Sequence, residues 1–360
     1  MSSLCTACDR GVAAVWIVHS PCPLAELLLV KNEVARVHNL LERVARQRTA
    51  ALMGIVNVTP NSFYDGGRYE TPEAGRQRVV QLLADGADIL DIGGESSKPG
   101  APAVPAEQQL QRIGSALAEA LSHDAIVSID TASASVAHET LERGAHIIND
   151  VTCLRDPELA SAVARHDAYL ILSHARCHQS QMAGFSEWPD DAYEDVVLEV
   201  RGDLRAAREV AVGRGVRPER VWFDPGLGFS KNARQSIELL SRISTLTGDA
   251  TPLVVGTSRK SFINALHPSA PEDRLGGTIA ASLWASRAGA HVLRVHDVAV
   301  VRQALLVDTA LYEARVEAED PALGLTGTPL QEAPSQEGPS RGQAVSPASP
   351  ALARAPGETT

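Results

Sequence analysis

Short apolar runs recur along most of this chain, and segments with helical spacing of apolar residues lie between them. An apolar run of about four to eight residues bounded by turn signals is typical of a buried strand. The eight runs are Ala51–Asn57, Ile89–Gly93, Ile126–Asp130, His146–Asp150, Tyr169–His174, Val221–Asp224, Leu253–Thr257 and Val292–His296. The helical segments are Pro72–Asp85, Pro105–Leu121, Ser133–Arg143, Asp156–Arg165, Asp191–Gly213, Asn232–Ser244, Arg274–Ala288 and Val298–Tyr312.

This alternation predicts an α/β protein built as a (β/α)8 TIM barrel. Eight strand–helix units in about 265 residues match that fold in number and in size. A doubly wound open sheet is the alternative, although such a sheet more often has about five to seven strands. We therefore expect one barrel domain over residues 49–320.

The two ends of the chain follow a different pattern. Residues 1–48 form an appendage in which Leu24–Arg46 carries a helical stripe of Leu and Val, and we expect this helix to pack on the barrel and close one end of it. Residues 321–360 are rich in Pro, Ser, Gly and Ala and have few large apolar side chains. Such a segment cannot bury enough surface to order itself, so we predict a disordered tail.

Polar residues stand at the ends of the predicted strands. Seven of the eight runs have one at or near the carboxyl end: Asn57, Asp91, Asp130, Asn149–Asp150, His174, Asp224 and His296. The remaining run, Leu253–Thr257, leads directly into Ser258–Arg259–Lys260. In a barrel all these ends meet on one face, where barrel active sites lie. Each residue alone is more simply a hydrogen-bonded core group, but together they predict an active site.

The first predicted strand continues into the most distinctive stretch, Met53–Gly67, which reads MGIVNVTPNSFYDGG. Asn57 interrupts its apolar run and is costly to bury unless another group bonds or coordinates it. The loop after the strand holds the carboxylate of Asp65 and a hinge-like pair, Gly66–Gly67. An ordinary strand and hairpin turn is an equally good interpretation of this stretch taken alone.

Composition and charge exclude several classes of function. The 360 residues have a formal net charge of −11 and a pI near 5.5, and no basic tract stands out, which argues against general nucleic-acid binding. No apolar run approaches the roughly 20 residues that span a bilayer, and no signal peptide is recognisable at the start. We therefore expect a cytoplasmic protein, and the net charge does not exclude an anionic small substrate, which needs only a local cluster of cations.

The five cysteines are odd in number and unevenly spread, so a disulfide framework is not expected. Cys5, Cys8, His19 and Cys22 form a C-x2-C…H-x2-C pattern that could hold a zinc ion. The residues between the two pairs are mostly apolar and supply no evident supporting element. Free thiols in a poorly ordered amino-terminal segment are the favoured interpretation.

The residues at the strand ends fall into two chemical groups. Carboxylates and an amide at Asp91, Asp130, Asp224 and Asn149 suit a ligand with an array of N–H donors, such as a guanidine-like heterocycle edge. A second group, expected to be cationic, suits a phosphate or diphosphate; it comprises Lys98, Arg259, Lys260, Arg294 and His296. Neither a P-loop nor a dinucleotide-binding fingerprint is present.

Seven motifs in order give these residues a family resemblance. They are MGIVNVTPNSFYDGG, DIGGESSKPGA, VSIDT, IINDV, DPGLGFSK, VVGTSRKSF and RVHDV, within residues 50–312. The chain resembles the dihydropteroate synthase family, which is the target of sulfonamides. The resemblance implies a Mg²⁺-assisted condensation of 7,8-dihydropterin-6-ylmethyl diphosphate with 4-aminobenzoate, which gives 7,8-dihydropteroate and diphosphate. It also implies a homodimer, and it does not extend to residues 1–48 or to the tail.

The resemblance further implies roles for single residues. The pterin would be held by Asp130, Asn149, Asp224, Lys260 and Arg294. The aminobenzoate site would be lined by Phe63, Ser97, Pro99, Phe229, Lys260 and Ser261. The diphosphate would be bound by Asn57, Lys98, Arg294 and His296, and Asn57 would also ligate Mg²⁺. The residues expected to take part in catalysis are Asp65, Lys260, Arg294 and His296.

The predicted loops depart from the family pattern, whereas the pterin-pocket residues do not. Asn61 replaces Asp, Tyr64 replaces a small Ser, Ser97–Lys98 replaces Thr–Arg, and Ser230 replaces Gly. These departures lead to the hypothesis that aminobenzoate affinity or sulfonamide sensitivity is altered. They also keep open a non-catalytic pterin-binding paralogue. The pterin domain of methyltetrahydrofolate-dependent methyltransferases is a further alternative, although methyl transfer leaves no diphosphate for Arg294 and His296 to bind.

Overall fold

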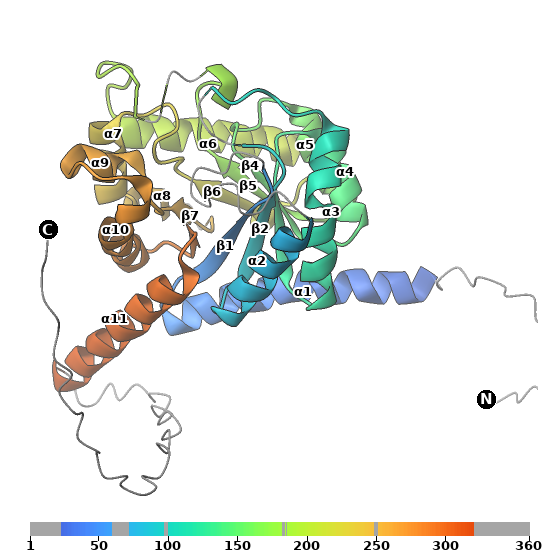
Figure 1. The fold of residues 1–360 in the computed structure, drawn as a ribbon, viewed down its shortest axis with the longest axis horizontal. Coiled ribbons are helices and arrows are strands. Elements are labelled where there is room, and N and C mark those ends of the chain that lie inside the picture. The colour runs from blue at the N-terminus through green and yellow to red at the C-terminus, as the bar shows by residue number, and fades with distance from the viewer. Residues whose placement is uncertain are drawn as a thin grey trace, which may run out of the picture. The chain divides into compact units, whose positions relative to one another are not determined.

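The computed structural model describes residues 23–59, 72–96, 100–181, 184, 186–247 and 251–319. Within them, helices surround a sheet of eight parallel strands (Figure 1). The strands are β1 Ala51–Asn57, β2 Ile89–Gly93, β3 Ile126–Asp130, β4 Ile147–Asp150, β5 Tyr169–Ser173, β6 Val221–Asp224, β7 Val254–Gly256 and β8 Val292–Val295. The predicted strands therefore agree with the observed ones to within a residue at each end.

The sheet curves into a nearly closed (β/α)8 barrel, as the alternation of strands and helices predicts. Its strand order is β6-β5-β4-β3-β2-β1-β8-β7, and all the paired strands are parallel. The two end strands approach each other through one parallel bridge between Phe223 and Leu253. The backbone N–H of Phe223 also donates to the carbonyl of Pro252 at 2.9 Å. The carboxyl ends of the strands consequently lie on one face.

Most of the helices lie in the connections between strands, whereas the first precedes the first strand and the last follows the last strand. They are α1 Pro23–Gln47, α2 Pro72–Ala84, α3 Ala106–Ser122, α4 Ala134–Glu142, α5 Pro157–Arg165, α6 Val196–Gly213, α7 Ala233–Ser241, α8 Ser244–Thr247, α9 Ser261–Leu266, α10 Leu275–Arg287 and α11 Val298–Glu319, with short 3-10 turns at Gln179–Gln181, Pro218–Arg220 and Pro271–Asp273. Helix α6 begins five residues later than predicted, because the side chain of Asp195 caps it by accepting from Val197 N and Leu198 N. Helix α9 was not predicted.

Most of the hydrophobic core lies between the outer face of the sheet and the inner faces of the helices. It includes Val56 and Leu90 from the strands and Leu82 and Ile113 from α2 and α3, all buried. The strands are buried on both faces because helices cover the outer face of the sheet and side chains fill the barrel interior. Their sequences accordingly are continuous apolar runs instead of alternating patterns.

A second core lies inside the barrel, at the amino-terminal ends of the strands. Val37, Leu40 and Val44 of α1 are buried there against strand residues that include Met53 and Trp222. These three positions follow an i, i+3, i+7 spacing, which places them on one face of a helix. Helix α1 thus contacts the end of the barrel opposite to the carboxyl ends of the strands.

Several predictions concern residues that the structure does not describe. The tail at residues 321–360 and the Cys/His pattern at residues 5–22 both lie outside the described ranges. The domain boundaries at residues 48 and 320 stay predictions. Among the described helices, none has the length and apolar composition needed to cross a membrane.

Candidate active site at the carboxyl ends of the strands

Polar side chains from six strands occur near the carboxyl end of the barrel: Asn57, Asp91, Asp130, Asn149, Asp224 and Arg294. The strand register places Asn57 and Asp130 at the same level of the sheet, because Asn57 lies beside Gly93 and Gly93 lies beside Asp130. Asp130 in turn lies beside Asn149. The topology therefore brings the predicted pterin residues onto adjacent strands of one face.

Arg294 joins two of the carboxylates. Its Nε donates to Oδ2 of Asp91 at 2.6 Å, and its Nη2 donates to Oδ2 of Asp130 at 2.8 Å. Asp91 is fully buried, and the side chain of Arg294 retains 18% exposure. A charge-assisted pair of this kind fixes the orientation of a guanidinium. Sequence reasoning grouped Asp91 with the acids but assigned it no role.

Two buried oxygen atoms beside this pair have no hydrogen-bond partner among the described residues. Asn149 donates through Nδ2 to Oδ2 of Asp91 at 3.1 Å, which leaves its own Oδ1 unbonded. Oδ1 of Asp91 is likewise unbonded. Buried acceptors are almost always satisfied in folded proteins, so two of them together indicate acceptors available to an N–H-rich ligand.

The charges of this cluster influence its proton equilibria. Burial raises the pKa of Asp130 to about 7, and Arg294 opposes that rise. Burial alone would lower the pKa of Arg294, but the carboxylates of Asp91 and Asp130 outweigh it and raise the pKa above its ordinary value. Arg294 is therefore permanently charged, whereas the Asp130 carboxyl can gain or lose a proton near neutral pH.

Asp224 ends β6 and turns the chain into the loop of the DPGLGFSK motif. Its Oδ1 accepts from the backbone N–H of Gly226 at 2.7 Å. Gly226 has φ +64°, and a Cβ there would lie 2.0 Å from the carbonyl oxygen of His174, so the position requires glycine. Burial raises the pKa of Asp224, while the Gly226 bond and Lys260 oppose that rise. The turn thus holds a carboxylate in the site.

Lys260 interacts with an aromatic ring and with the charge of Asp224. Its Nζ is 4.8 Å from the ring centroid of Phe229, within the range of a cation–π interaction. Its stem lies beside Gly256, since a Cβ at that glycine would be 3.6 Å from Cε of Lys260, an ordinary contact. Burial lowers the pKa of Lys260 to about 8, while Asp224 opposes the fall.

The next residue, Ser261, begins the unpredicted helix α9. Its Oγ lies 2.6 Å from Oγ of Ser186, which belongs to the long segment after β5. Gly228 lies nearby, since a Cβ there would be 3.7 Å from Oγ of Ser261. The loop between β6 and α7, which carries Gly228 and Phe229, therefore lies beside Lys260 and Ser261. The resemblance assigns Phe229, Lys260 and Ser261 to one subsite.

His296 follows β8 and is buried. Its Nδ1 lies 2.9 Å from Oγ of Ser258, and that oxygen also accepts from the backbone N–H of His296 at 3.3 Å. The Ser258 hydroxyl can then donate its proton to Nδ1, which favours the tautomer with the proton on Nε2. Burial, aided by the positive charge of Arg294, moves the pKa of His296 well below its ordinary value.

The cationic group predicted from the sequence needs two corrections. His296 is neutral at pH 7, because a buried imidazole beside an arginine resists protonation, so it can supply one N–H donor but no charge. Arg259 directs its guanidinium to Asp297, with Nε to Oδ2 at 3.0 Å and Nη2 to Oδ1 at 2.7 Å. Of the described members, Lys260 and Arg294 are the cations that the structure places with the site carboxylates.

Sequence reasoning missed a buried lysine behind the site. Lys231 is 1% exposed, and its Nζ donates to Nδ1 of His174 at 2.8 Å. It also donates to the carbonyls of Gly226 at 3.2 Å and Phe229 at 3.0 Å. Nε2 of His174 lies 3.0 Å from Oδ2 of Asp203. The DPGLGFSK motif contains Lys231, but its spacing alone did not reveal these contacts.

His174, which was predicted at a strand end facing the site, is a core residue. It is fully buried, and both of its ring nitrogens have partners in the described chain. Asp150 is also engaged, because its carboxylate accepts from the backbone N–H and hydroxyl of Thr152 and from the N–H of Leu154. Both residues therefore stabilise the ends of their strands.

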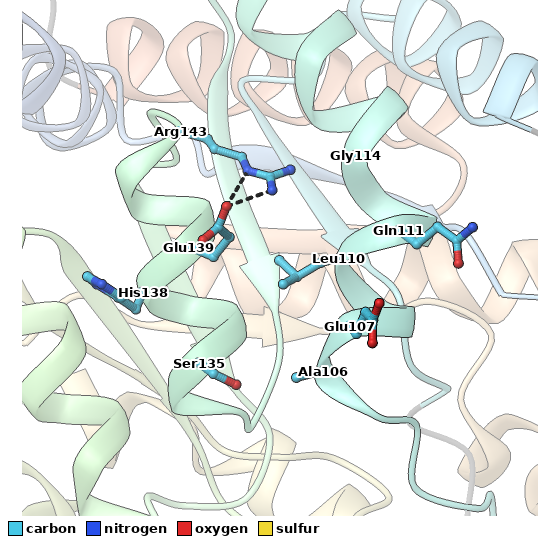
Figure 2. A pocket seen from close by; sticks show the side chains of 9 residues that line it. All are labelled: Ala106, Glu107, Leu110, Gln111, Gly114, Ser135, His138, Glu139 and Arg143. Carbon is cyan, nitrogen blue, oxygen red and sulfur yellow. Dashed lines mark hydrogen bonds and ion pairs between the residues drawn. The ribbon is translucent and has the colours of Figure 1, made fainter.

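The other predicted site residues cannot be placed. Phe63 and Asp65 after β1, together with Ser97, Lys98 and Pro99 after β2, lie outside the described residues. A groove of about 700 Å³ occurs elsewhere, on the outer face between α3 and α4 (Figure 2). Its lining includes Leu110 and Arg143 and none of the strand-end residues.

Comparison with known proteins agrees with this geometry. The family model described as pterin binding enzyme matches residues 53–296. A dihydropteroate synthase of Synechocystis sp. is 38% identical over 72% of this chain and 90% of its own length. The Yersinia pestis dihydropteroate synthase in complex with a sulfonamide drug is 33% identical, with a TM-score of 0.70 and coverage of 74% of this chain and 95% of that one. The Xanthomonas albilineans enzyme with 4-aminobenzoic acid is 39% identical, with a TM-score of 0.66 and coverage of 73% and 93%.

Proposed function

The chain belongs to the dihydropteroate synthase family of pterin-binding enzymes, and we propose that it catalyses the reaction of that family. In this reaction the amine nitrogen of 4-aminobenzoate bonds to the pterin methylene carbon. The bond from that carbon to the diphosphate oxygen breaks, and the amine loses a proton. The products are 7,8-dihydropteroate and diphosphate. The observation that carries the proposal is the buried cluster of Asp91, Asp130, Asn149 and Arg294 at the strand ends.

The acidic side of the site is suited to the pterin ring. A pterin presents a guanidine-like edge of N–H donors, and the buried oxygens of Asp130, Asn149 and Asp224 are acceptors. The unbonded Oδ1 of Asn149 is one acceptor that such an edge would satisfy. Arg294, held in place by two carboxylates, can lie against the ring. These contacts support the assignment of the pterin to this side.

The diphosphate is assigned to the opposite side of Arg294. Arg294 is permanently charged, and His296 can donate from a neutral imidazole, so both can bind phosphate oxygens. The amide oxygen of Asn57, half-buried at the end of β1, fits the oxygen-donor preference of Mg²⁺. When bound there, Mg²⁺ would neutralise charge on the leaving diphosphate. Lys98 is proposed as a further residue that binds the diphosphate.

The aminobenzoate is assigned to the surface formed by Phe229, Lys260 and Ser261. The ring of Phe229 offers an apolar face, and the Lys260 ammonium can attract a carboxylate. The charge of Asp224 acts on Lys260, which supports a position for this surface next to the acidic side of the site. Phe63, Ser97 and Pro99 stay proposed members, and Tyr64 remains the basis for altered sulfonamide sensitivity.

Catalysis then depends mainly on charge stabilisation. Loss of diphosphate leaves positive charge on the pterin methylene, and the carboxylates of the site stabilise this charge. Asp65 is proposed as a further carboxylate with the same role. Lys260 and Arg294 orient the two substrates instead of exchanging protons with them. The aminobenzoate amine is largely neutral at pH 7, so positioning matters more than a strong base.

Measurement of diphosphate release tests the proposal. The purified full chain receives the pterin diphosphate, Mg²⁺ and 4-aminobenzoate, and the product is identified by mass. We expect turnover that falls by about 100-fold or more in Lys260→Ala, because misplacement of bound substrates by about 1 Å can cost roughly 100-fold in rate. Arg214→Ala, which removes an exposed ion pair with Glu158, is the control and keeps full activity. Pterin binding without turnover would instead identify a non-catalytic paralogue.

We also propose that two copies of the chain associate through α10 and α11. These helices expose large apolar side chains in the described region, including Trp284 at 53%, Leu306 at 59%, Val307 at 56% and Leu311 at 66%. Apolar clusters of this kind on a surface commonly mark protein interfaces. A cytoplasmic location is likewise a proposal.

Light scattering after size exclusion tests the association. We expect a dimer for the unchanged chain and a monomer for Val307→Glu/Leu311→Glu, because two charges on this face oppose its burial. Leu198→Glu changes an equally exposed leucine on α6 and is the matched control. A monomer in all three proteins, or a dimer that survives the double substitution, contradicts the proposal.

A further inference from the structure

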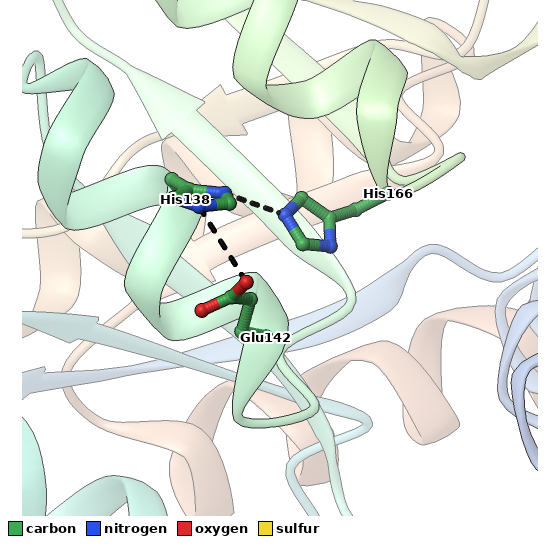
Figure 3. Close-up of side chains that lie close together, drawn as sticks. All are labelled: His138, Glu142 and His166. Carbon is green, nitrogen blue, oxygen red and sulfur yellow. Dashed lines mark hydrogen bonds and ion pairs between the residues drawn. The ribbon is translucent and has the colours of Figure 1, made fainter. Parts of the chain in front are cut away.

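Two histidines and a glutamate gather on the outer face of the barrel, between α4 and α5 (Figure 3). Nδ1 of His138 lies 2.8 Å from Nε2 of His166, and Nε2 of His138 lies 3.5 Å from Oε1 of Glu142. One ligand atom of each residue lies within 4.8 Å of the others. Both histidines are half-buried, while Glu142 is exposed.

The local structure holds these three side chains together. His138 and Glu142 are four residues apart on α4, which places them on one face of that helix. His166 is the C-cap of α5, the helix beside α4 in the ring around the barrel. Two of the side chains therefore come from α4, and the third comes from the turn directly after the adjacent helix α5.

This arrangement has the chemistry of a transition-metal site. Two imidazoles and a carboxylate are a common ligand set for Zn²⁺, with a fourth position left to water. Zn–N distances of about 2.0–2.1 Å in a tetrahedral site require the two nitrogens to be roughly 3.4 Å apart. The rings must separate by about 0.6 Å from their hydrogen-bonded distance. One imidazole gives only one nitrogen to an ion, so a rotation of the His138 ring or of Glu142 must also bring the carboxylate to the nitrogen that binds. One ligand atom of each residue already lies within 4.8 Å of the others.

We propose that His138, Glu142 and His166 form a Zn²⁺ site that links α4 to α5. The nitrogen-rich ligand set favours zinc over magnesium, which prefers oxygen ligands and keeps its waters. Glu142 is exposed and both histidines are half-buried, so a hydrated ion can reach the cluster from solvent. The site is separate from the strand-end cluster and does not depend on the proposed reaction.

The position of this cluster predicts that bound zinc affects the stability of the fold and does not affect turnover. Glu142 ends α4 and His166 follows the last residue of α5, so the cluster lies where these helices return to the starts of β4 and β5. In barrels the amino-terminal ends of the strands contribute stability, whereas the opposite ends carry catalysis. An ion bound to the folded state alone stabilises it in proportion to the logarithm of its concentration.

Calorimetric titration with zinc chloride tests the proposal. The protein is the full chain without an affinity tag, with Cys5, Cys8 and Cys22 replaced by serine so that the amino-terminal Cys/His pattern supplies no thiolates. Excess Mg²⁺ is present throughout. We expect one zinc per chain, and at least about tenfold weaker binding in His138→Ala, His166→Ala and Glu142→Gln. That factor is a lower bound, because loss of a residue that merely supports a metal ligand already costs about 10–100-fold.

His123→Ala is the matched control. His123 and Glu119 form another histidine–glutamate pair four residues apart on α3, with Nε2 to Oε1 at 3.0 Å, but they belong to no described three-ligand cluster. We expect this variant to bind zinc with unchanged affinity. In addition, zinc should raise the melting temperature of the parent and of His123→Ala but not that of His166→Ala. Absence of one-to-one binding, or binding retained in the three variants, overturns the proposal.

Discussion

At the scale of single residues, the site depends on how Arg294 is held. Asp91 is fully buried and bonds both Arg294 and Asn149, so it orients one residue on each side of it along the barrel. Asp91 itself keeps one unbonded oxygen. This carboxylate is therefore a positioning residue for the groups assigned to the pterin and to the diphosphate.

Asp91→Asn should reduce activity without preventing folding. The amide keeps the size of the carboxylate and removes its charge, so Arg294 loses one of its two ion pairs and retains Asp130. A charge-assisted hydrogen bond contributes about 1.5–3 kcal/mol, which corresponds to a roughly 10–100-fold fall in kcat/KM. Steady-state kinetics with each substrate measure it. Because Asp91 positions residues assigned to the pterin and to the diphosphate, the KM for the pterin diphosphate should rise. A change confined to the KM for aminobenzoate would contradict this role.

Asp130 predicts a pH dependence of pterin binding. Its pKa is raised to about 7, so the carboxyl is protonated below that pH and loses acceptor capacity for an N–H edge. Binding should therefore tighten as pH rises, by about tenfold between pH 6 and pH 8, because the ionised fraction of a carboxyl with a pKa of about 7 rises from roughly one-eleventh to roughly ten-elevenths over that range. Titrations of the pterin at several pH values check this slope. Asp130→Asn should bind weakly with a flat profile, and a slope retained in that variant would assign the titration to another group.

At the scale of elements, the loop between β6 and α7 is held from behind by Lys231. Its ammonium donates to His174 on one side and to two loop carbonyls, those of Gly226 and Phe229, on the other. Burial lowers the pKa of Lys231 to about 7, and Asp224 opposes that fall. The loop that carries Phe229 is consequently tied to the end of β5 by one buried side chain.

Lys231→Met should loosen this loop. The substitution keeps an unbranched stem but leaves the acceptors of His174, Gly226 and Phe229 without their donor, and an unsatisfied buried group costs about 1–3 kcal/mol. We expect a matching loss in the free energy of unfolding by urea, and a larger rise in KM for aminobenzoate than for the pterin. Arg234→Met removes an exposed cation from the same segment and is the control. Equal changes in the two Michaelis constants would mean that Lys231 supports only the fold and does not position the aminobenzoate surface.

The elements that sequence reasoning missed have local causes. Helix α7 ends at Ser241 and α8 restarts at Ser244, with no glycine or proline to mark the interruption. Helix α9 has six residues, too few for a periodic pattern to identify. By contrast, Asn232 was recognised as a helix start, and it caps α7 through a reciprocal bond with Gln235.

At the scale of the molecule, the barrel was predictable because its strands are short, apolar and regularly interrupted. Topology then placed Asn57, Asp130 and Asp224 on one face without any knowledge of side-chain contacts. The partners of individual side chains were not predictable. Arg294 and Asp91 are separated by 203 positions in the chain, and their contact depends on barrel closure and rotamers that no local pattern encodes. The same applies to Arg259, whose motif groups it with Lys260 although it pairs with Asp297.

The opposite end of the barrel supports a last prediction, which separates stability from catalysis. Leu40 of α1 is 6% exposed and packs with Val37 and Val44 against the residues that fill the barrel interior, including Met53 and Trp222. Truncation of a buried leucine removes its contacts and leaves a cavity, which typically costs about 2–5 kcal/mol. Leu40→Ala should therefore lower the free energy of unfolding by that amount.

The kinetic constants of Leu40→Ala should stay unchanged at temperatures where the variant is folded, because the strand ends that carry the site lie at the other end of the barrel. Arg36→Ala, which removes an exposed ion pair between α1 and Asp124, should cost less than about 1 kcal/mol and serves as the control. Urea denaturation and steady-state kinetics on the same preparations compare the two effects. A fall in kcat without loss of stability would show that α1 acts on the site through the core. Loss of stability at constant kcat would show that α1 closes this end of the barrel and contributes to stability alone.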